Sequence, residues 1–158
     1  MLRIAVCDDD LKFTGDFETL VLQESRNMGI RVETDVFSDG DTLVKSILSG
    51  ERYNLIFLDI EMKQVDGISA ARCIREIDRS VLLIYISGYD QYLKELFEVE
   101  PFRFLSKPVN DNKFCRYFRE ACQRMQIPLH RITDSASNGS VFPVVTEHFS
   151  ASSDHAFL

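Results

Sequence analysis

Five short apolar segments alternate along this sequence with segments whose apolar residues recur at helical spacing. The apolar segments are residues 2–7, 32–37, 54–58, 81–86 and 102–105. A helical pattern follows each of them, at residues 13–21, 43–48, 71–77, 92–97 and 114–125. The apolar segments are continuous runs, as is typical of strands covered on both faces. The sequence therefore predicts an α/β fold in which five helices cover both faces of a five-stranded parallel sheet.

Charged side chains follow three of these predicted strands at the point where each strand ends. Asp8 and Asp9 follow the first, Asp59 follows the third, and Lys107 follows the fifth. In an open parallel sheet, ligands bind beyond the carboxyl ends of the strands. Carboxylates there can hold a hard divalent cation, and a lysine can neutralise phosphoryl oxygens. The pattern indicates a phosphate switch built around one aspartate.

The overall charge narrows the possible partners. The chain of 158 residues carries 25 acidic and 18 basic side chains, a formal net charge of -7. This balance argues against nonspecific binding to DNA, RNA or an anionic membrane, each of which attracts basic proteins. No apolar stretch approaches the length of about 18 residues that marks a membrane-spanning helix. We therefore expect no membrane segment.

The cysteines and the first residues of the chain indicate the cellular compartment. Cys7, Cys73, Cys115 and Cys122 show neither metal-binding spacing nor the density of a disulfide scaffold. The first residues run directly into a predicted strand, without the long apolar region and cleavage site of a signal peptide. We expect reduced thiols and a cytoplasmic location.

The character of the sequence changes near residue 127. Residues 1–126 hold the alternating pattern and are predicted to form one domain. Residues 127–158 lack helical periodicity and are rich in serine, at Ser135, Ser137, Ser140, Ser150, Ser152 and Ser153. We interpret them as a tail, or as a linker truncated before an output domain.

The charged and small residues at the strand ends resemble a known pattern. The residues concerned are Asp8, Asp9, Asp59, Asp66, Gly67, Ser87, Phe104, Lys107 and Pro108. In order and spacing they resemble the receiver domain of two-component response regulators, which implies a flavodoxin-like, doubly wound parallel sheet of strand order 2-1-3-4-5. The stretches 57–62 and 97–99 also resemble receivers attached to LytTR-type DNA-binding domains.

The resemblance implies a role for each acidic residue. Asp59 would be the phosphoacceptor, taking a phosphoryl group from a histidine of a sensor kinase. Asp9, Asp59 and the main-chain carbonyl of Glu61 would hold Mg²⁺, with Asp8 assisting through water. No substrate would be turned over, so the domain would not be an enzyme beyond its own phosphotransfer and dephosphorylation.

The resemblance also implies a switch. Lys107 would pair with the phosphoryl oxygens, followed by Pro108 through a cis bond, and the Ser87 hydroxyl would move to bind one of the oxygens. Phe104 would then reorient inward, by packing alone, because it lacks the phenol of the tyrosine found in many receivers. The output surface would be the fourth helix, fifth strand and fifth helix, a face through which we expect a homodimer.

Two other functions remain open from the sequence. A phosphatase of the haloacid dehalogenase type would use Asp59, Ser87 and Lys107 similarly, but it needs a second aspartate where Glu61 stands. A stand-alone interaction module would keep the fold and act through protein contacts. DNA binding by a receiver of this kind would require an output domain of about a hundred residues. Only 32 residues follow residue 126.

Overall fold

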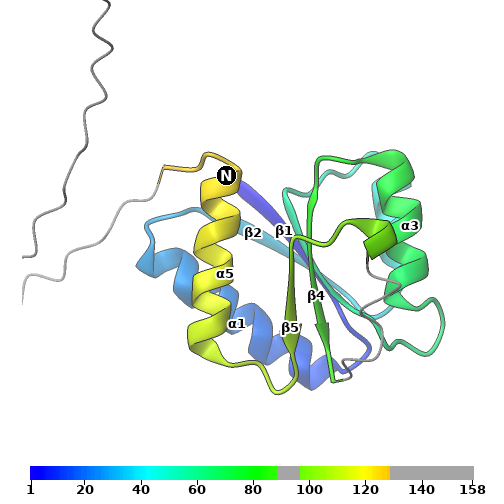
Figure 1. Ribbon diagram of the computed structural model, residues 1–158, viewed down its shortest axis with the longest axis horizontal. Coiled ribbons are helices and arrows are strands. Elements are labelled where there is room, and N and C mark those ends of the chain that lie inside the picture. The colour runs from blue at the N-terminus through cyan, green and yellow to red at the C-terminus, as the bar shows by residue number, and fades with distance from the viewer. Residues whose placement is uncertain (89–96, 129–158) are drawn as a thin grey trace, which may run out of the picture.

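The five apolar segments form one parallel sheet in the computed structural model, which describes residues 1–88 and 97–128 (Figure 1). The strand order is β2-β1-β3-β4-β5, which confirms the predicted fold class. The strands are β1 (Leu2–Cys7), β2 (Val32–Phe37), β3 (Leu55–Asp59), β4 (Leu82–Ser87) and β5 (Arg103–Ser106). β3, β4 and β5 each begin and end one residue later than predicted, so that Asp59 and Ser87 are the last residues of their strands.

Helices cover both faces of this sheet (Figure 1). The α-helices in the described part of the chain are α1 (Leu11–Asn27), α2 (Gly40–Leu48), α3 (Gly67–Ile77) and α5 (Asp111–Arg124). The predicted helix at residues 92–97 lies outside the described residues except for its last residue, which begins the short 3₁₀ helix η2 (Phe97–Val99).

Two separate apolar cores result from this layering. Side chains of a strand alternate between its two faces. Ile56, Leu58 and Leu83 therefore pack with α2 and α3, whereas Phe57 and Ile84 pack with α1 and α5. Because both faces are buried, β1, β3 and β4 consist almost entirely of apolar residues, and the sheet holds their carboxyl ends at one edge.

The expectation of a continuous apolar run is wrong for β2. This strand reads Val-Glu-Thr-Asp-Val-Phe and none of its residues is fully buried. It lies at the edge of the sheet, where the helices cover its faces less completely. Asp35 of β2 instead forms an ion pair with Arg3 of the neighbouring β1, with 2.8 Å between the guanidinium Nη2 and the carboxylate Oδ2.

Aspartates begin three of the helices. Asp10, Asp39 and Asp66 are the N-cap residues of α1, α2 and α3, and each carboxylate accepts hydrogen bonds from backbone N–H groups of the first turn. Such caps satisfy donors that lack an intrahelical partner. The caps of α1 and α3 thereby fix the ends of the loops that follow β1 and β3, the two strands with acidic residues at their carboxyl ends.

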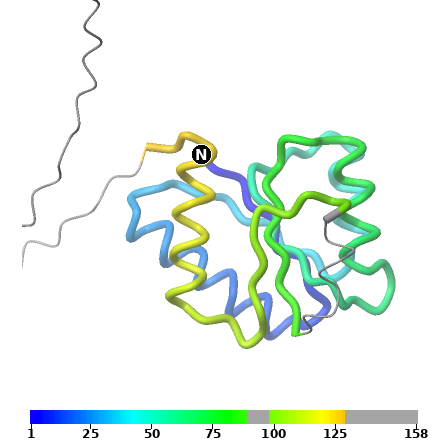
Figure 2. Tube along the Cα trace, viewed as in Figure 1, coloured from blue at the N-terminus to red at the C-terminus, as the bar shows by residue number. Residues whose placement is uncertain are grey.

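The opposite edge of the sheet carries the chain's N-terminus. Met1 and Leu2 line a pocket together with residues 125–128, which follow α5. Figure 2 shows the start of the chain beside the segment that follows α5. The N-terminus and the end of the described chain are thus neighbours. The described part of the chain therefore ends at the edge that lies away from Asp8, Asp9 and Asp59 (Figure 1).

Candidate functional site

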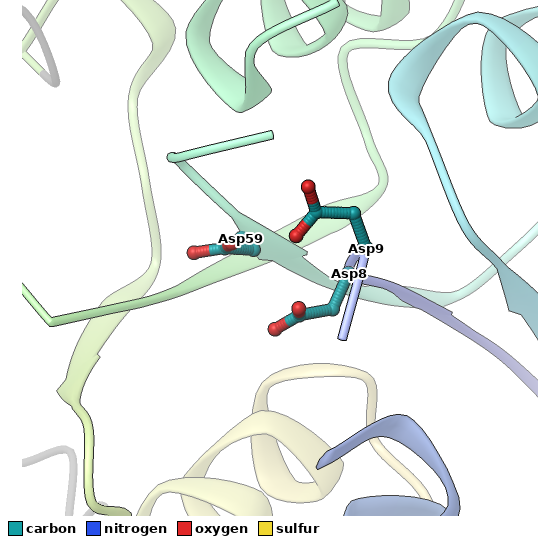
Figure 3. A group of neighbouring side chains, drawn as sticks. All are labelled: Asp8, Asp9 and Asp59. Carbon is teal, nitrogen blue, oxygen red and sulfur yellow. The ribbon is translucent and has the colours of Figure 1, made fainter. Parts of the chain in front are cut away.

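Three carboxylates meet at the carboxyl edge of the sheet. Asp8 and Asp9 follow β1, and Asp59 ends β3, which is the adjacent strand (Figure 3). One carboxylate oxygen from each lies within 4.8 Å of the others. Asp8 and Asp59 are 1% and 4% exposed, and Asp9 is the most accessible of the three. The predicted acidic cluster is confirmed, and its oxygen-only chemistry suits a hard divalent cation such as Mg²⁺.

Backbone donors orient all three carboxylates. The Asp10 N–H donates to Asp8 Oδ1 at 2.9 Å, and the Lys63 N–H donates to Asp9 Oδ2 at 3.3 Å. The Glu61 N–H donates to the Asp59 carboxylate. These bonds come from the loops after β1 and β3, so the local chain path positions the three acids.

Lys107 reaches the acidic cluster from the end of β5. Its backbone N–H donates to the Ser87 carbonyl at 2.8 Å, and the Lys107-Pro108 peptide bond is cis, as the resemblance implies. The ammonium Nζ lies 2.6 Å from Asp8 Oδ2 and 3.6 Å from Asp59 Oδ2. The Lys107 ammonium therefore lies between the two buried carboxylates, where it can also bind a third anionic group.

The ring of Phe13 forms one wall beside this lysine. The Lys107 Nζ lies 4.5 Å from the ring centroid, a distance at which an ammonium is attracted to an aromatic face. Sequence reasoning missed this contact because Phe13 reads there simply as a core residue of α1. No local pattern could have shown it, since 94 residues separate the two along the chain.

Burial changes the acidity of the phosphoacceptor candidate. Loss of hydration and the neighbouring charge of Asp8 raise the pKa of Asp59 to about 6, although Lys107 and the Glu61 N–H oppose this shift. Ionisation of Asp59 is therefore less favourable in the folded protein, and an additional positive charge nearby would make it more favourable. This is the electrostatic setting expected for a site that takes up a cation.

A glycine allows the next helix to approach this aspartate. The Gly67 N–H, at the start of α3, donates to the Ile60 carbonyl at 2.9 Å. A Cβ atom at Gly67 would lie 2.0 Å from the Asp59 carbonyl oxygen. Asp66 and Gly67 belong to the pattern of residues identified in the sequence, and the structure shows that only glycine fits at position 67 against the backbone of Asp59.

The two candidate switch residues lie on neighbouring strands. Ser87 ends β4 and is completely buried, and it pairs with Ser106 of β5. Phe104, two residues earlier on β5, is half-buried and packs against the core formed with α2 and α3. Both residues stand where the sequence placed them, and their movement on phosphorylation stays a prediction.

The described residues include no helix long and apolar enough to cross a membrane.

Known proteins share this arrangement. Residues 4–119 match the response regulator receiver domain family. The sensory transduction protein LytT of Bacillus subtilis (strain 168) is 23% identical over 113 residues, which cover 72% of this chain and 45% of LytT. The transcriptional regulatory protein YpdB of Escherichia coli (strain K12) is 25% identical over 112 residues, which cover 71% of this chain and 44% of YpdB. The chain thus spans less than half the length of these curated relatives.

A solved structure agrees with this match. The response regulator TrrA of Thermotoga maritima, crystallised in complex with Mg²⁺-BeF, superposes with a TM-score of 0.67 at 25% identity, over 77% of this chain and 99% of TrrA. The family match extends over most of the sequence and includes the acidic cluster, Ser87 and Lys107. This chain therefore belongs to the response regulator receiver domain family.

Proposed function

We propose that this chain is the phosphorylation-activated receiver of a two-component response regulator, with Asp59 as the phosphoacceptor. One observation carries the proposal: Asp8, Asp9 and Asp59 converge at one strand edge, and Lys107 reaches two of them. A carboxylate nucleophile, a cation-binding pair of acids and a fixed ammonium are the groups that phosphoryl transfer to an aspartate requires.

In the proposed reaction, an Asp59 carboxylate oxygen attacks the phosphorus of a phosphohistidine. The oxygen-phosphorus bond forms while the bond from phosphorus to the histidine nitrogen breaks, and the released imidazole takes up a proton from solvent. Lys107 neutralises a phosphoryl oxygen, and the buried position of Asp59 limits access of water. Hydrolysis of the acyl phosphate returns the carboxylate, so the chain is a phosphoacceptor with self-catalysed steps and not an enzyme with a separate substrate.

Mg²⁺ is the proposed cofactor. Asp9, Asp59 and the main-chain carbonyl of Glu61 would hold it, with Asp8 assisting through water. Their oxygen-only donor set and the raised pKa of Asp59 support a divalent cation there, as does the Mg²⁺-BeF complex of TrrA. The cation would screen the negative charges of Asp59 and of the incoming phosphoryl group.

The proposed output is a change of surface. The Ser87 hydroxyl would bind a phosphoryl oxygen, Phe104 would move inward, and the face containing β5 and α5 would change. The phosphoryl group can shift this equilibrium only because it binds the two conformations differently. A sensor histidine kinase is the proposed phosphodonor.

The chain's wider context is also a proposal. We infer a receiver at residues 1–126 and a tail or linker at residues 127–158, located in the cytoplasm. The similarity to LytT and YpdB supports a role in transcription, through a DNA-binding domain outside this chain. A stand-alone interaction module is the alternative. The haloacid dehalogenase alternative loses its basis, because the chain belongs to the receiver family and Glu61 replaces the required second aspartate.

Labelling with acetyl phosphate and Mg²⁺ tests the chemistry. We expect one acid-stable, base-labile phosphoryl group on the wild type and none on Asp59→Asn. Asp10→Asn is the matched control, because it removes one neighbouring charge and keeps a good N-cap residue. Label that persists in Asp59→Asn, or that is absent from the wild type, would refute the assignment.

Sedimentation equilibrium tests the proposed dimer. We expect self-association of the wild type with Mg²⁺ and beryllofluoride, a phosphoryl mimic, and a monomer for Asp59→Ala under the same conditions. Identical behaviour of the two proteins would argue against a phosphorylation-dependent dimer through the fourth helix, β5 and α5.

A further inference from the structure

The hydroxyl of Tyr85 is buried without a hydrogen-bond partner among the described residues. Tyr85 lies within β4, is 0% exposed, and packs in the core formed with α2 and α3. A hydroxyl that leaves water without gaining a partner lowers stability, and most buried polar groups are therefore paired. A phenylalanine would fill the same space without this loss. The packing of this conformation alone gives no reason for the hydroxyl.

The position of Tyr85 connects it to both candidate switch residues. It precedes Ser87 by two residues on β4, so the two side chains leave the same face of the sheet. It is also the direct partner of Phe104 on β5, and Phe104 packs against the core that contains Tyr85. The Tyr85 phenol thus lies near Ser87 and Phe104, the two residues that are proposed to move. The ring of Phe104 carries no hydroxyl.

A hydrogen-bond donor stands on the helix that covers this core. Arg75 of α3 donates to the carbonyls of Val81, Val99 and Glu100 at 2.7, 2.9 and 3.2 Å. A guanidinium has five N–H groups, so two remain beyond these three bonds. Burial raises the pKa of Tyr85 well above its usual range, and among charged groups Arg75 opposes that rise most. The guanidinium is therefore the charged group that acts most strongly on this phenol.

The other side of this core is fixed by polar contacts. Arg72 forms an ion pair with Glu98 at 2.7 Å, and Arg75 holds the carbonyls that follow, so that α3 is tied to η2 and to the residues leading into β5. Phe104 is only half-buried. Phe104 takes part in none of these bonds, so its ring can change position without breaking them.

We propose that the Tyr85 hydroxyl is a switch group, which gains a hydrogen bond from the Arg75 guanidinium when the domain is phosphorylated. This inference rests on the proposed function. As Phe104 packs inward, the Tyr85 ring shifts towards α3 and its oxygen accepts a free N–H of Arg75. Tyr85 is then a positioning residue that never touches the phosphoryl group, and it supplies the polar contact that Phe104 cannot make.

Tyr85→Phe separates the two conformations. In EDTA without a phosphoryl mimic, we expect a urea unfolding midpoint equal to or above that of the wild type, because the lost hydroxyl had no partner. With saturating Mg²⁺, we expect beryllofluoride to bind about fivefold to tenfold more weakly by calorimetry, the effect of one hydrogen bond made only in the bound form. Mg²⁺ affinity alone should not change.

Tyr53→Phe is the matched control. Its hydroxyl is also buried, but it donates to Asp35 Oδ2 at 2.9 Å and lies 3.3 Å from Ser46 Oγ. We expect this variant to unfold at lower urea concentration and to bind beryllofluoride as the wild type does. In an Arg75→Met background, Tyr85→Phe should weaken beryllofluoride binding no further, because methionine has no N–H group to donate to the Tyr85 oxygen.

Three results would overturn the inference. Equal beryllofluoride affinity of Tyr85→Phe and the wild type would show that no bond is gained. A lowered unfolding midpoint of Tyr85→Phe in EDTA would show that the hydroxyl already has a partner, such as a buried water. Additive effects of Tyr85→Phe and Arg75→Met would exclude Arg75 as the donor that Tyr85 gains. Failure of the wild type itself to bind beryllofluoride would instead refute the proposed function, and this inference with it.

Discussion

Lys107 lies closer to Asp8 than to Asp59: its Nζ is 2.6 Å from Asp8 Oδ2 and 3.6 Å from Asp59 Oδ2. In this arrangement the ammonium mainly neutralises the more buried of the two carboxylates. Release of Lys107 to a phosphoryl oxygen would leave Asp8 uncompensated unless another cation took its place. Binding of a metal ion and engagement of Lys107 with a phosphoryl group are therefore expected to support one another.

Removal of the Lys107 charge should destabilise the domain. We expect Lys107→Met to lower the free energy of unfolding by about 2 kcal/mol in EDTA, because Asp8 loses a charged hydrogen-bond partner in a buried position. Saturating Mg²⁺ should reduce this loss. Urea denaturation measures both values. Lys63→Met, at an exposed position, should change stability by at most about 0.5 kcal/mol, and equal losses in the two variants would contradict the role of the pair.

Mg²⁺ should stabilise the protein through the acidic cluster. A ligand that binds only the folded state at 100 times its Kd adds about 2.7 kcal/mol to the free energy of unfolding. We expect this gain for the wild type and for Asp10→Asn, and a much smaller gain for Asp9→Asn, which removes one proposed ligand. Thermal unfolding with and without Mg²⁺ provides the comparison. A full gain in Asp9→Asn would place the ion elsewhere.

The raised pKa of Asp59 predicts a pH-dependent effect of its removal. The folded value of about 6 exceeds the ordinary value of 3.8, so the unfolded chain loses this proton first as the pH rises. The contribution of Asp59 to stability is therefore present below about pH 4 and is lost as the pH rises to about 6. The difference between the two pKa values of Asp59 corresponds to about 3 kcal/mol in the free energy of unfolding.

Asp59→Asn tests this dependence in EDTA. The variant should match the wild type near pH 4 and exceed its free energy of unfolding by about 3 kcal/mol above pH 6. Asp16→Asn, which replaces an exposed carboxylate of α1, should show no such divergence. A constant difference between Asp59→Asn and the wild type across this range would mean that ionisation is not its cause.

The sequence could predict the features that depend on local pattern. Apolar runs predicted β1, β3, β4 and β5, and helical spacing predicted α1, α2, α3 and α5. The meeting of Asp8, Asp9 and Asp59 followed from the rule that parallel strands present their carboxyl ends at one edge. The strands and helices depend on residues that are close in the sequence, and the acidic cluster depends on a general rule of sheet topology.

The features that escaped sequence analysis depend on contacts between distant segments. The polar residues Glu33, Thr34 and Asp35 already distinguish β2 from the apolar central strands, but only the strand order shows that β2 lies at the edge of the sheet. The ring of Phe13 beside Lys107, and the carbonyls of Val99 and Glu100 bound by Arg75, involve residues far apart in the chain. Side-chain packing of the whole domain determines these contacts, and no local pattern encodes them.

The close approach of Gly67 to Asp59 leads to the last prediction. A Cβ atom at position 67 would lie 2.0 Å from the Asp59 carbonyl oxygen and 2.9 Å from the Ile60 Cα atom, both of them backbone atoms that cannot turn aside. Gly67→Ala must therefore displace α3 from the end of β3. We expect a loss of about 3 kcal/mol, in the range for overpacked cores, together with slower acetyl phosphate labelling, because the Asp59 carboxylate moves relative to Lys107.

Gly15→Ala is the matched control for this change. Gly15 lies within α1, and a Cβ atom there would meet nothing within 4 Å. Alanine at this position should stabilise the domain by about 0.5 to 1 kcal/mol through helix propensity, without altering the labelling rate. If Gly67→Ala instead behaves like Gly15→Ala in urea denaturation and in labelling, then the start of α3 does not constrain Asp59, and the geometry of the phosphoacceptor depends on the loop after β3 alone.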